Sequence, residues 1–419
     1  MVTQAQTSAH TTARGEWRAW WPLTLAALAG YSVLGLQSYG IGPFVSELER
    51  EFGWSRTQVM LGVSISNGIG VFLNILAGML ADRIGPRKVG MAGVVIFCAV
   101  FALFGTATGS TANWLLLWGM LAVGIVLIQA PIWTSAVAAR FDRSRGLAMA
   151  VVLSGTSITA LVVPVLATWL IGQHGWRLAF AGVAGTWIAM TLPIIFLWFQ
   201  DGRAAKGATP EERPAEAPVL AGLTFREGLR TRAFVCLIVS FGAFSFYNMS
   251  VATNIVRLLA ETGISDMQAA GIASALGLAG ITGRLSVGFL LDRFSAPLIG
   301  FISQMLPVLA CAILLMDVSG VAALTLAVVL FGLATGAEVD VALYLATRHF
   351  GLKAYAALFG AIITFGAVNA AISPAVAGLI HDRTGSYDGL LLAIMAVMTV
   401  GAIAVALIGP PRRVWNQRH

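Results

Sequence analysis

The sequence predicts an all-helical integral membrane protein whose chain crosses the bilayer twelve times. Of its 419 residues, 58% are hydrophobic and 11% are charged, whereas about a quarter of the residues in ordinary soluble domains are charged. A soluble chain of this length has too little interior to bury so much apolar surface. A bilayer provides an apolar solvent, and the chain contains twelve apolar runs long enough to span one, at about 17–25 residues each.

The apolar runs are separated by short polar segments. The longest connection, 200–232, carries Pro210, Pro214 and Pro218 and divides the runs six and six. Such an even division indicates two halves related by an internal repeat. The runs lie at residues 20–45, 57–81, 89–109, 113–138, 147–171, 178–199, 233–259, 268–291, 297–316, 320–347, 355–380 and 387–409.

Five regions follow from this division of the chain. We expect a cytoplasmic N-terminal tail at 1–19, an N-terminal six-helix bundle at 20–199, a cytoplasmic linker at 200–232, a C-terminal six-helix bundle at 233–409 and a cytoplasmic C-terminal tail at 410–419. The two bundles are expected to be pseudo-symmetric.

The distribution of Lys and Arg predicts which helix ends face the cytoplasm. Twenty of the 26 basic residues fall in segments on the same side as the N-terminus, whereas the opposite loops hold Arg50, Arg56, Arg177 and Arg383. Basic loops stay on the cytoplasmic side, so both termini are expected there, in a multi-pass protein of the cell (inner) membrane. The net charge of +7 reflects this topology, and no nucleic-acid partner is expected because the basic residues do not gather on one folded face.

A short polar loop is repeated at matching positions of the two halves. Each copy places a glycine four residues before an Asp-Arg pair at the end of a span, where the glycine allows close helix packing and the aspartate can accept hydrogen bonds from the amides that begin a partner helix. The first copy contains Gly78, Asp82, Arg83, Gly85, Arg87 and Lys88, the second Gly288, Asp292 and Arg293, and a partial third Gly378, Asp382, Arg383 and Gly385.

This duplicated loop resembles the signature of the major facilitator superfamily, and the match in layout covers nearly the whole chain. The resemblance implies two six-helix bundles around a central cavity that opens alternately to the two sides of the membrane. It also implies that the repeated loop takes part in the conformational change.

Three further stretches are similar to the monocarboxylate-transporter and oxalate–formate-exchanger group of that superfamily. Residues 140–155 resemble the basic lead into the fifth span, and residues 30–38 can be laid on the first span. Residues 283–288 resemble the eighth span, whose arginine binds the substrate carboxylate, so the resemblance implies this role for Arg284. The chain departs from the group at two places: Gln37 replaces a proton-accepting lysine, and Gly280 replaces an aspartate one turn before the arginine.

Ionisable residues at membrane depth are the strongest candidates for function, since each costs about 2.5–3.5 kcal/mol to insert. Arg284 and Asp340 each lie eight residues from a cytoplasmic helix end, so they share a depth and are expected to be able to pair. Arg284 would hold a carboxylate through its two-pronged donors, and Asp340 would neutralise it in the empty site and exchange a proton. A permanent ion pair that only joins two helices is the alternative. Glu338 is about 200° round the helix from Asp340, and we expect it either to brace a neighbouring helix or to share the proton-coupling role.

Neutral polar residues within the spans are weaker candidates, because such residues usually form hydrogen bonds between helices. Those predicted to contact substrate are Gln37, Asn67, Tyr247, Asn248 and Asn369. The histidines show no metal-ligand spacing and no phosphate-binding loop is present, so we expect no metal, no cofactor, no ATP-driven pump and no enzymatic activity.

The sequence as a whole favours a secondary transporter of a small organic anion, a mono- or dicarboxylate or an aromatic acid, driven by protons or by exchange. Its expected partners are the lipid bilayer, the carboxylate and a proton, and we expect it to work as a monomer. The first alternative is an exporter of drugs or hydrophobic metabolites on the same fold. Many such exporters keep an arginine in the fourth span, where this chain has Trp118, Gly119 and Met120. A membrane sensor is the second alternative, although the tails are short for an additional soluble domain.

Overall fold

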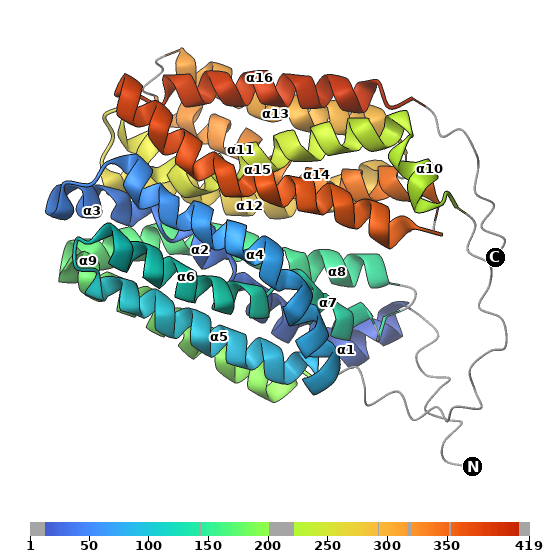
Figure 1. The fold of residues 1–419 in the computed structure, drawn as a ribbon, viewed down its shortest axis with the longest axis horizontal. Coiled ribbons are helices and arrows are strands. Elements are labelled where there is room, and N and C mark those ends of the chain that lie inside the picture. The colour runs from blue at the N-terminus through green and yellow to red at the C-terminus, as the bar shows by residue number, and fades with distance from the viewer. Residues whose placement is uncertain are drawn as a thin grey trace. The chain divides into compact units, whose positions relative to one another are not determined.

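The computed structural model describes residues 13–138, 140–141, 144–200, 222–291, 293–316, 320–351 and 353–409. These residues form α-helices and short 3-10 helices, with no β-strand among them, so the all-helical prediction is confirmed (Figure 1). The helices that precede the linker are α1 (Ala13–Ser32), α2 (Gly35–Tyr39), α3 (Val45–Phe52), α4 (Arg56–Ile84), α5 (Pro86–Leu103), α6 (Thr111–Leu127), α7 (Ala130–Ala138), α8 (Arg145–Leu153) and α9 (Gly155–Trp198). Those that follow it are α10 (Phe225–Leu229), α11 (Arg232–Ala260), α12 (Asp266–Leu291), α13 (Ala296–Leu315), α14 (Val321–Phe350), α15 (Tyr355–Thr384) and α16 (Asp388–Ala406).

Ten helical segments of the described chain are long and apolar enough to cross a membrane. One of them, Gly146–Trp198, has 53 residues and is broken at Gly175, where φ is 75° and ψ is 161°. This break separates the predicted fifth and sixth spans. Helix α4, with 29 residues, covers the predicted second span, and the helices therefore account for the twelve expected crossings.

The chain packs as two compact units. The first contains Met1–Gln37 and Phe72–Arg213, and the second contains Ser38–Val71 and Pro214–His419. Residues 38–71, which the sequence assigns to the N-terminal bundle, thus pack with the C-terminal helices. The division into bundles at 20–199 and 233–409 stays a prediction.

The first unit contains a cluster of aromatic side chains on α6, α9 and the short 3-10 helix that follows α5 (Phe104–Thr106). Trp118 is fully buried, and its ring lies 5.0 Å from that of Phe104 and 5.9 Å from that of Trp114. Phe180 of α9 packs edge-on against Phe104 at 5.6 Å. The stretch in which many drug exporters carry an arginine is therefore apolar packing here, with offset and edge-on ring contacts that favour a fixed geometry.

In the second unit, glycines bring α12 and α14 into backbone contact. A Cβ atom added to Gly283 would lie 2.3 Å from the carbonyl oxygen of Leu333, and one added to Gly336 would lie 2.0 Å from that of Gly280. Small residues allow this approach in membrane proteins, where packing rather than the hydrophobic effect joins helices. The contact fixes the part of α14 that carries Glu338 and Asp340 against the part of α12 that carries Arg284.

Candidate functional site

Arg284 on α12 faces Asp340 on α14. Its Nε atom lies 3.4 Å from Oδ2 of Asp340, and the Arg284 side chain is 10% exposed while that of Asp340 is 28% exposed. The two side chains form the ion pair that their common depth suggested. Gly283 directly precedes Arg284 and Gly336 lies four residues before Asp340, so the close crossing of the helices sets the distance between the charges.

The pairing leaves much of the guanidinium unused. At 3.4 Å the Nε–Oδ2 contact is electrostatic without the geometry of a hydrogen bond, and Nε is a buried atom with no hydrogen-bond acceptor in the described structure. An arginine carries five N–H donors in a planar fork. Among the residues that the structure describes, Asp340 is the one acidic side chain within ion-pair distance of Arg284. The site therefore holds a largely buried cation with donors to spare.

Two predicted substrate residues on α11 are occupied with a neighbouring helix. Tyr247 is fully buried, and its hydroxyl donates to the carbonyl oxygen of Phe331 at 2.5 Å and lies 3.0 Å from Oγ1 of Thr335. Asn248, which is half-buried, donates from Nδ2 to the same Thr335 Oγ1 at 3.2 Å. In this conformation Tyr247 joins α11 to α14 within the second unit. The side chain of Asn248 remains partly exposed.

The other predicted substrate residues are spread over both units. Asn369 is half-buried and donates to the carbonyl oxygen of Phe365 at 2.9 Å within α15. Asn67 is half-buried in α4, in the second unit, whereas Gln37 is buried at the end of the first unit. Their contact with a substrate stays a prediction.

Glu338 lies in a separate buried cluster that joins three helices. Its Oε1 accepts from Ser240 of α11 at 3.2 Å and from Nε2 of Gln304 of α13 at 2.6 Å, and its Oε2 lies 2.8 Å from Oγ of Ser303. Glu338 is 2% exposed and Gln304 is fully buried. The bracing of neighbouring helices expected from the sequence is present. The three partners were missed because neutral polar residues within spans carry no pattern that predicts which of them meet.

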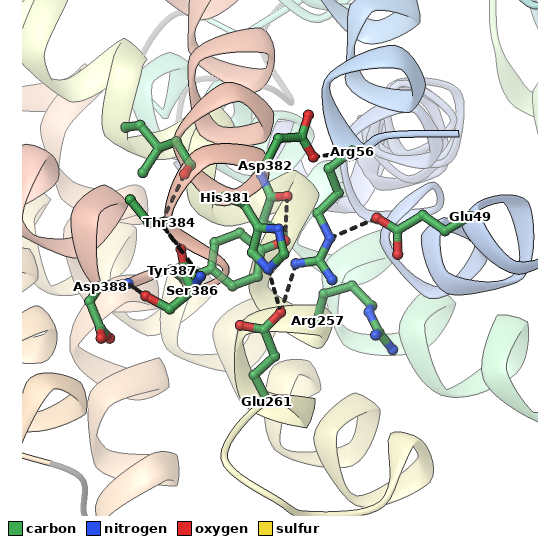
Figure 2. A network of polar contacts seen from close by, with 12 residues as sticks. Glu49, Arg56, Arg257, Glu261, His381, Asp382, Thr384, Ser386, Tyr387 and Asp388 are labelled. Atoms are coloured by element: carbon green, nitrogen blue, oxygen red, sulfur yellow. Dashed lines mark hydrogen bonds and ion pairs between the residues drawn. The ribbon is translucent and has the colours of Figure 1, made fainter. Parts of the chain in front are cut away.

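A second polar cluster, the Arg56 cluster, surrounds the start of α4 (Figure 2). Arg56 is 6% exposed, and its Nε lies 2.8 Å from Oε1 of Glu49 while its Nη1 lies 2.7 Å from Oε1 of Glu261. Its guanidinium also stacks over the ring of Tyr387, 5.0 Å from the ring centre. Nε2 of His381 lies 3.0 Å from the same oxygen of Glu261. From the sequence, Arg56 was expected only as a loop charge.

Tyr387 closes the Arg56 cluster from the side of α16. Burial raises the pKa of its hydroxyl above the ordinary value, so the group stays protonated and donates to Oδ1 of Asn254 at 3.0 Å. This bond joins the start of α16 to α11. The cluster therefore ties together five helices of the second unit, α3, α4, α11, α15 and α16, around one compensated cation.

The third copy of the repeated loop shows the capping interaction expected from its sequence. Asp382, at the end of α15, lies beside Arg56 (Figure 2) and accepts a hydrogen bond from its backbone amide at 3.0 Å. It also accepts from the backbone amide of Thr57 at 3.0 Å and from the hydroxyl of Thr57. A Cβ atom added to Gly378 would lie 2.8 Å from the Cα of Thr57. The glycine thus permits the approach and the aspartate satisfies the free amides at the start of α4.

Comparison with known proteins places this arrangement in a family. Residues 27–374 match the Major Facilitator Superfamily. The chain belongs to that superfamily. It is 25% identical over 398 residues to monocarboxylate transporter 13 of Bos taurus, covering 93% of this chain and 88% of that protein. It is 26% identical over 384 residues to the 3-(3-hydroxy-phenyl)propionate transporter of Escherichia coli K12, covering 89% and 88%.

The fold is also similar to a solved structure of the superfamily. A bacterial homologue of the human lysosomal transporter Spinster, in an inward-facing and unoccupied conformation, superposes with a TM-score of 0.66 at 16% identity and covers 92% of this chain and 93% of its own. The helical fold is thus that of major facilitator transporters, which are membrane transport proteins rather than enzymes.

The first two copies of the superfamily loop are described only in part. Gly85 begins the turn before α5 with φ of 93°, and Arg87 donates from Nη2 to the carbonyl oxygen of Phe196 at 2.6 Å. The surroundings of Gly78, the side chain of Asp82 and the whole of Asp292 lie outside the described residues. The remaining members are Arg83 and Lys88, which are exposed, Gly288, where an added Cβ would meet open space, and Arg293, whose guanidinium lies 4.0 Å from the centre of the Phe289 ring.

Proposed function

We propose that this protein is a secondary transporter of small organic anions, with Arg284 as the group that binds the substrate carboxylate. The observation that carries the proposal is the incomplete compensation of Arg284: a side chain that is 10% exposed has one carboxylate 3.4 Å away and no hydrogen bond to it. A substrate carboxylate can take two parallel N–H···O bonds from a guanidinium.

Asp340 is the counter-charge of the empty site. Without it, an isolated arginine at membrane depth would carry the full cost of an unpaired charge. A carboxylate substrate would bind the guanidinium through the donors that Asp340 leaves unused, while Asp340 stays beside the cation. The pair thus holds the site ready for an anion and keeps the charge compensated in the absence of one.

Two relatives support the substrate class. One is named as a monocarboxylate transporter and the other as a transporter of an aromatic propionate. Both substrates carry a carboxylate, and they differ in the group attached to it. We therefore propose a carboxylate as substrate, with the cell membrane as location, both termini cytoplasmic, and a monomer as the working unit.

The test is uptake of labelled acetate, lactate, oxalate, benzoate and 3-phenylpropionate into proteoliposomes. Arg284→Ala is expected to reduce kcat/KM for each transported acid by about 10- to 150-fold, because hydrogen bonds to a charged group contribute about 1.5–3 kcal/mol. Arg284→Lys should keep part of the activity, since it retains the charge and loses the fork.

Arg257→Gln is the matched control. Arg257 also forms an ion pair of 3.4 Å, with Asp266, and is 17% exposed, but it lies in the last turn of α11. Its replacement should leave the uptake of every acid within about twofold. Equal uptake by Arg284→Ala and the parent protein would rule out the proposed anchor.

The exporter of drugs or hydrophobic metabolites stays as the second candidate. The aromatic packing of Trp118 in place of an arginine is one observation against it. In the same proteoliposomes, transport of hydrophobic cations with no uptake of any acid would favour the exporter.

A further inference from the structure

We propose that Glu338 is a proton-binding site and that its carboxyl carries the proton coupled to transport. The inference rests on the proposed function and adds to it the location of the coupling ion. Asp340 and Glu338 are both candidates from the sequence. Their surroundings differ, because Asp340 has a cation within 3.4 Å whereas Glu338 has only uncharged neighbours.

Glu338 is buried without an ion-pair partner among the described residues. Glu338 is 2% exposed, and within the described part of the chain no Lys, Arg or His side chain forms an ion pair with it. A carboxylate buried without a counter-charge is strongly disfavoured and takes up a proton instead. Asp340 avoids this outcome because Arg284 compensates its charge.

The groups that face Glu338 from the surrounding helices supply no positive charge. From α11, Tyr247 lies within electrostatic range of both Glu338 and Cys311. Cys311 is the one titratable side chain of α13, and the one charged residue of α16 is Asp388 at its first position. On the α12 side, Arg284 is paired with Asp340. Phenols and thiols are neutral or negative when they titrate, so neither Tyr247 nor Cys311 can supply a positive counter-charge to a carboxylate.

The hydrogen bonds of Ser303 also favour a protonated Glu338. Oγ of Ser303 lies 2.8 Å from Oε2 of Glu338 and 3.0 Å from the carbonyl oxygen of Gly300. A serine hydroxyl has one hydrogen, so it cannot donate to both oxygens. A proton on Oε2 of Glu338 completes the chain: Glu338 donates to Ser303, and Ser303 donates to Gly300.

The other oxygen of the carboxyl is compatible with the neutral acid. Oε1 accepts from Nε2 of Gln304 at 2.6 Å and from Oγ of Ser240 at 3.2 Å. Ser240, Ser303 and Gln304 belong to α11 and α13, whereas Glu338 belongs to α14. Displacement of α14 from these helices would remove all three partners and open the carboxyl to water, where its proton could leave. Glu338 can therefore hold a proton in one conformation and release it in another.

The direct test is infrared spectroscopy of the purified protein in lipid at neutral pH. The protein should show the carbonyl stretching band of a protonated carboxylic acid, Glu338→Gln should lose it, and Asp340→Asn should keep it. Ser303→Ala should shift the band without removing it, because the hydrogen-bond acceptor of the acid is gone. An absent band, or a band unchanged in both Glu338→Gln and Ser303→Ala, would overturn the assignment, and the second variant decides the matter if the first does not fold.

The functional test compares two kinds of uptake in proteoliposomes. Glu338→Gln keeps the hydrogen-bonding shape of the neutral acid, so it should retain exchange of labelled for unlabelled 3-phenylpropionate or whichever panel acid is transported. The stimulation of its uptake by a pH gradient should be at least tenfold smaller than in the parent protein. Full stimulation in Glu338→Gln would overturn the coupling role. If the parent protein exchanges no acid, the proposed function fails, while the infrared band still decides whether Glu338 binds a proton.

Discussion

Arg56 and Arg284 are both nearly buried arginines of the second unit, and their surroundings are opposite. Arg56 has two carboxylates at 2.8 and 2.7 Å and an aromatic ring over its face. Arg284 has one carboxylate at 3.4 Å and a buried Nε without an acceptor. A cation with all its partners in place contributes to the fold, whereas a cation with unused donors can bind an anion. Burial alone does not distinguish the two, but the number of partners does.

The largest expected effect comes from exchanging the charges of the Arg284–Asp340 ion pair. In the double variant Arg284→Asp with Asp340→Arg, an ion pair is rebuilt between the same two helices. If the pair only joined α12 and α14, the exchange would restore activity lost in the single variants. We expect a folded protein whose carboxylate uptake stays about 10- to 150-fold below the parent, since the guanidinium has moved to another helix. Uptake in proteoliposomes and thermal unfolding of the same preparations measure the two properties.

The next effect concerns stability at the Arg56 cluster. Arg56→Gln leaves Glu49 and Glu261 without their shared cation. Loss of one partner of a buried ion pair costs about 3–5 kcal/mol, and because these glutamates are 25% and 30% exposed we expect about 2–3 kcal/mol. Thermal unfolding monitored by fluorescence checks the loss, and KM for the transported acid should stay within about twofold.

Arg50→Gln provides the control for Arg56. Arg50 lies on the neighbouring helix α3 and pairs with Glu47, but its side chain is 77% exposed. Exposed pairs contribute little, so unfolding should be unchanged. Equal destabilisation by the two variants would contradict the distinction between compensated burial and surface charge.

The smallest effect is expected at the capping aspartate. The amides of Arg56 and Thr57 donate to different oxygens of Asp382, so Asp382→Asn keeps one of the two bonds and loses the charge. The cost should be about 1 kcal/mol, within the usual range for helix caps. Gly378→Ala should be more damaging, because its Cβ would lie 2.8 Å from the Thr57 backbone. Thermal unfolding that ranks Asp382→Asn as the more destabilising of the two would show that the charge, rather than the close approach, holds α15 to α4.

The sequence predicted the fold well because the bilayer imposes simple rules. Apolar length, the loop charges and the repeated glycine and aspartate are local features, and they were sufficient for the helical membrane fold and its family. The pairing of Arg284 with Asp340 was also accessible, since unpaired charges are so rarely tolerated within spans.

Other parts of the candidate site could not be read from the sequence. Ser240, Ser303 and Gln304 meet Glu338 only through the packing of three helices, and neutral polar residues are frequent within spans. Tyr247 was a candidate to contact substrate, but its hydroxyl is used between α11 and α14. Arg56 was counted as a loop charge because its partners are brought from α11 and α16, far along the chain.

The central claim is that Arg284 recognises a carboxylate, and equilibrium binding tests it most directly. A labelled acid from the uptake panel is bound to the purified protein and displaced either by the same unlabelled acid or by its amide, which has the same shape and no charge. The account predicts that the acid displaces the label at least tenfold more effectively than the amide, and that Arg284→Gln removes this preference. Equal displacement by acid and amide in the parent protein would contradict it.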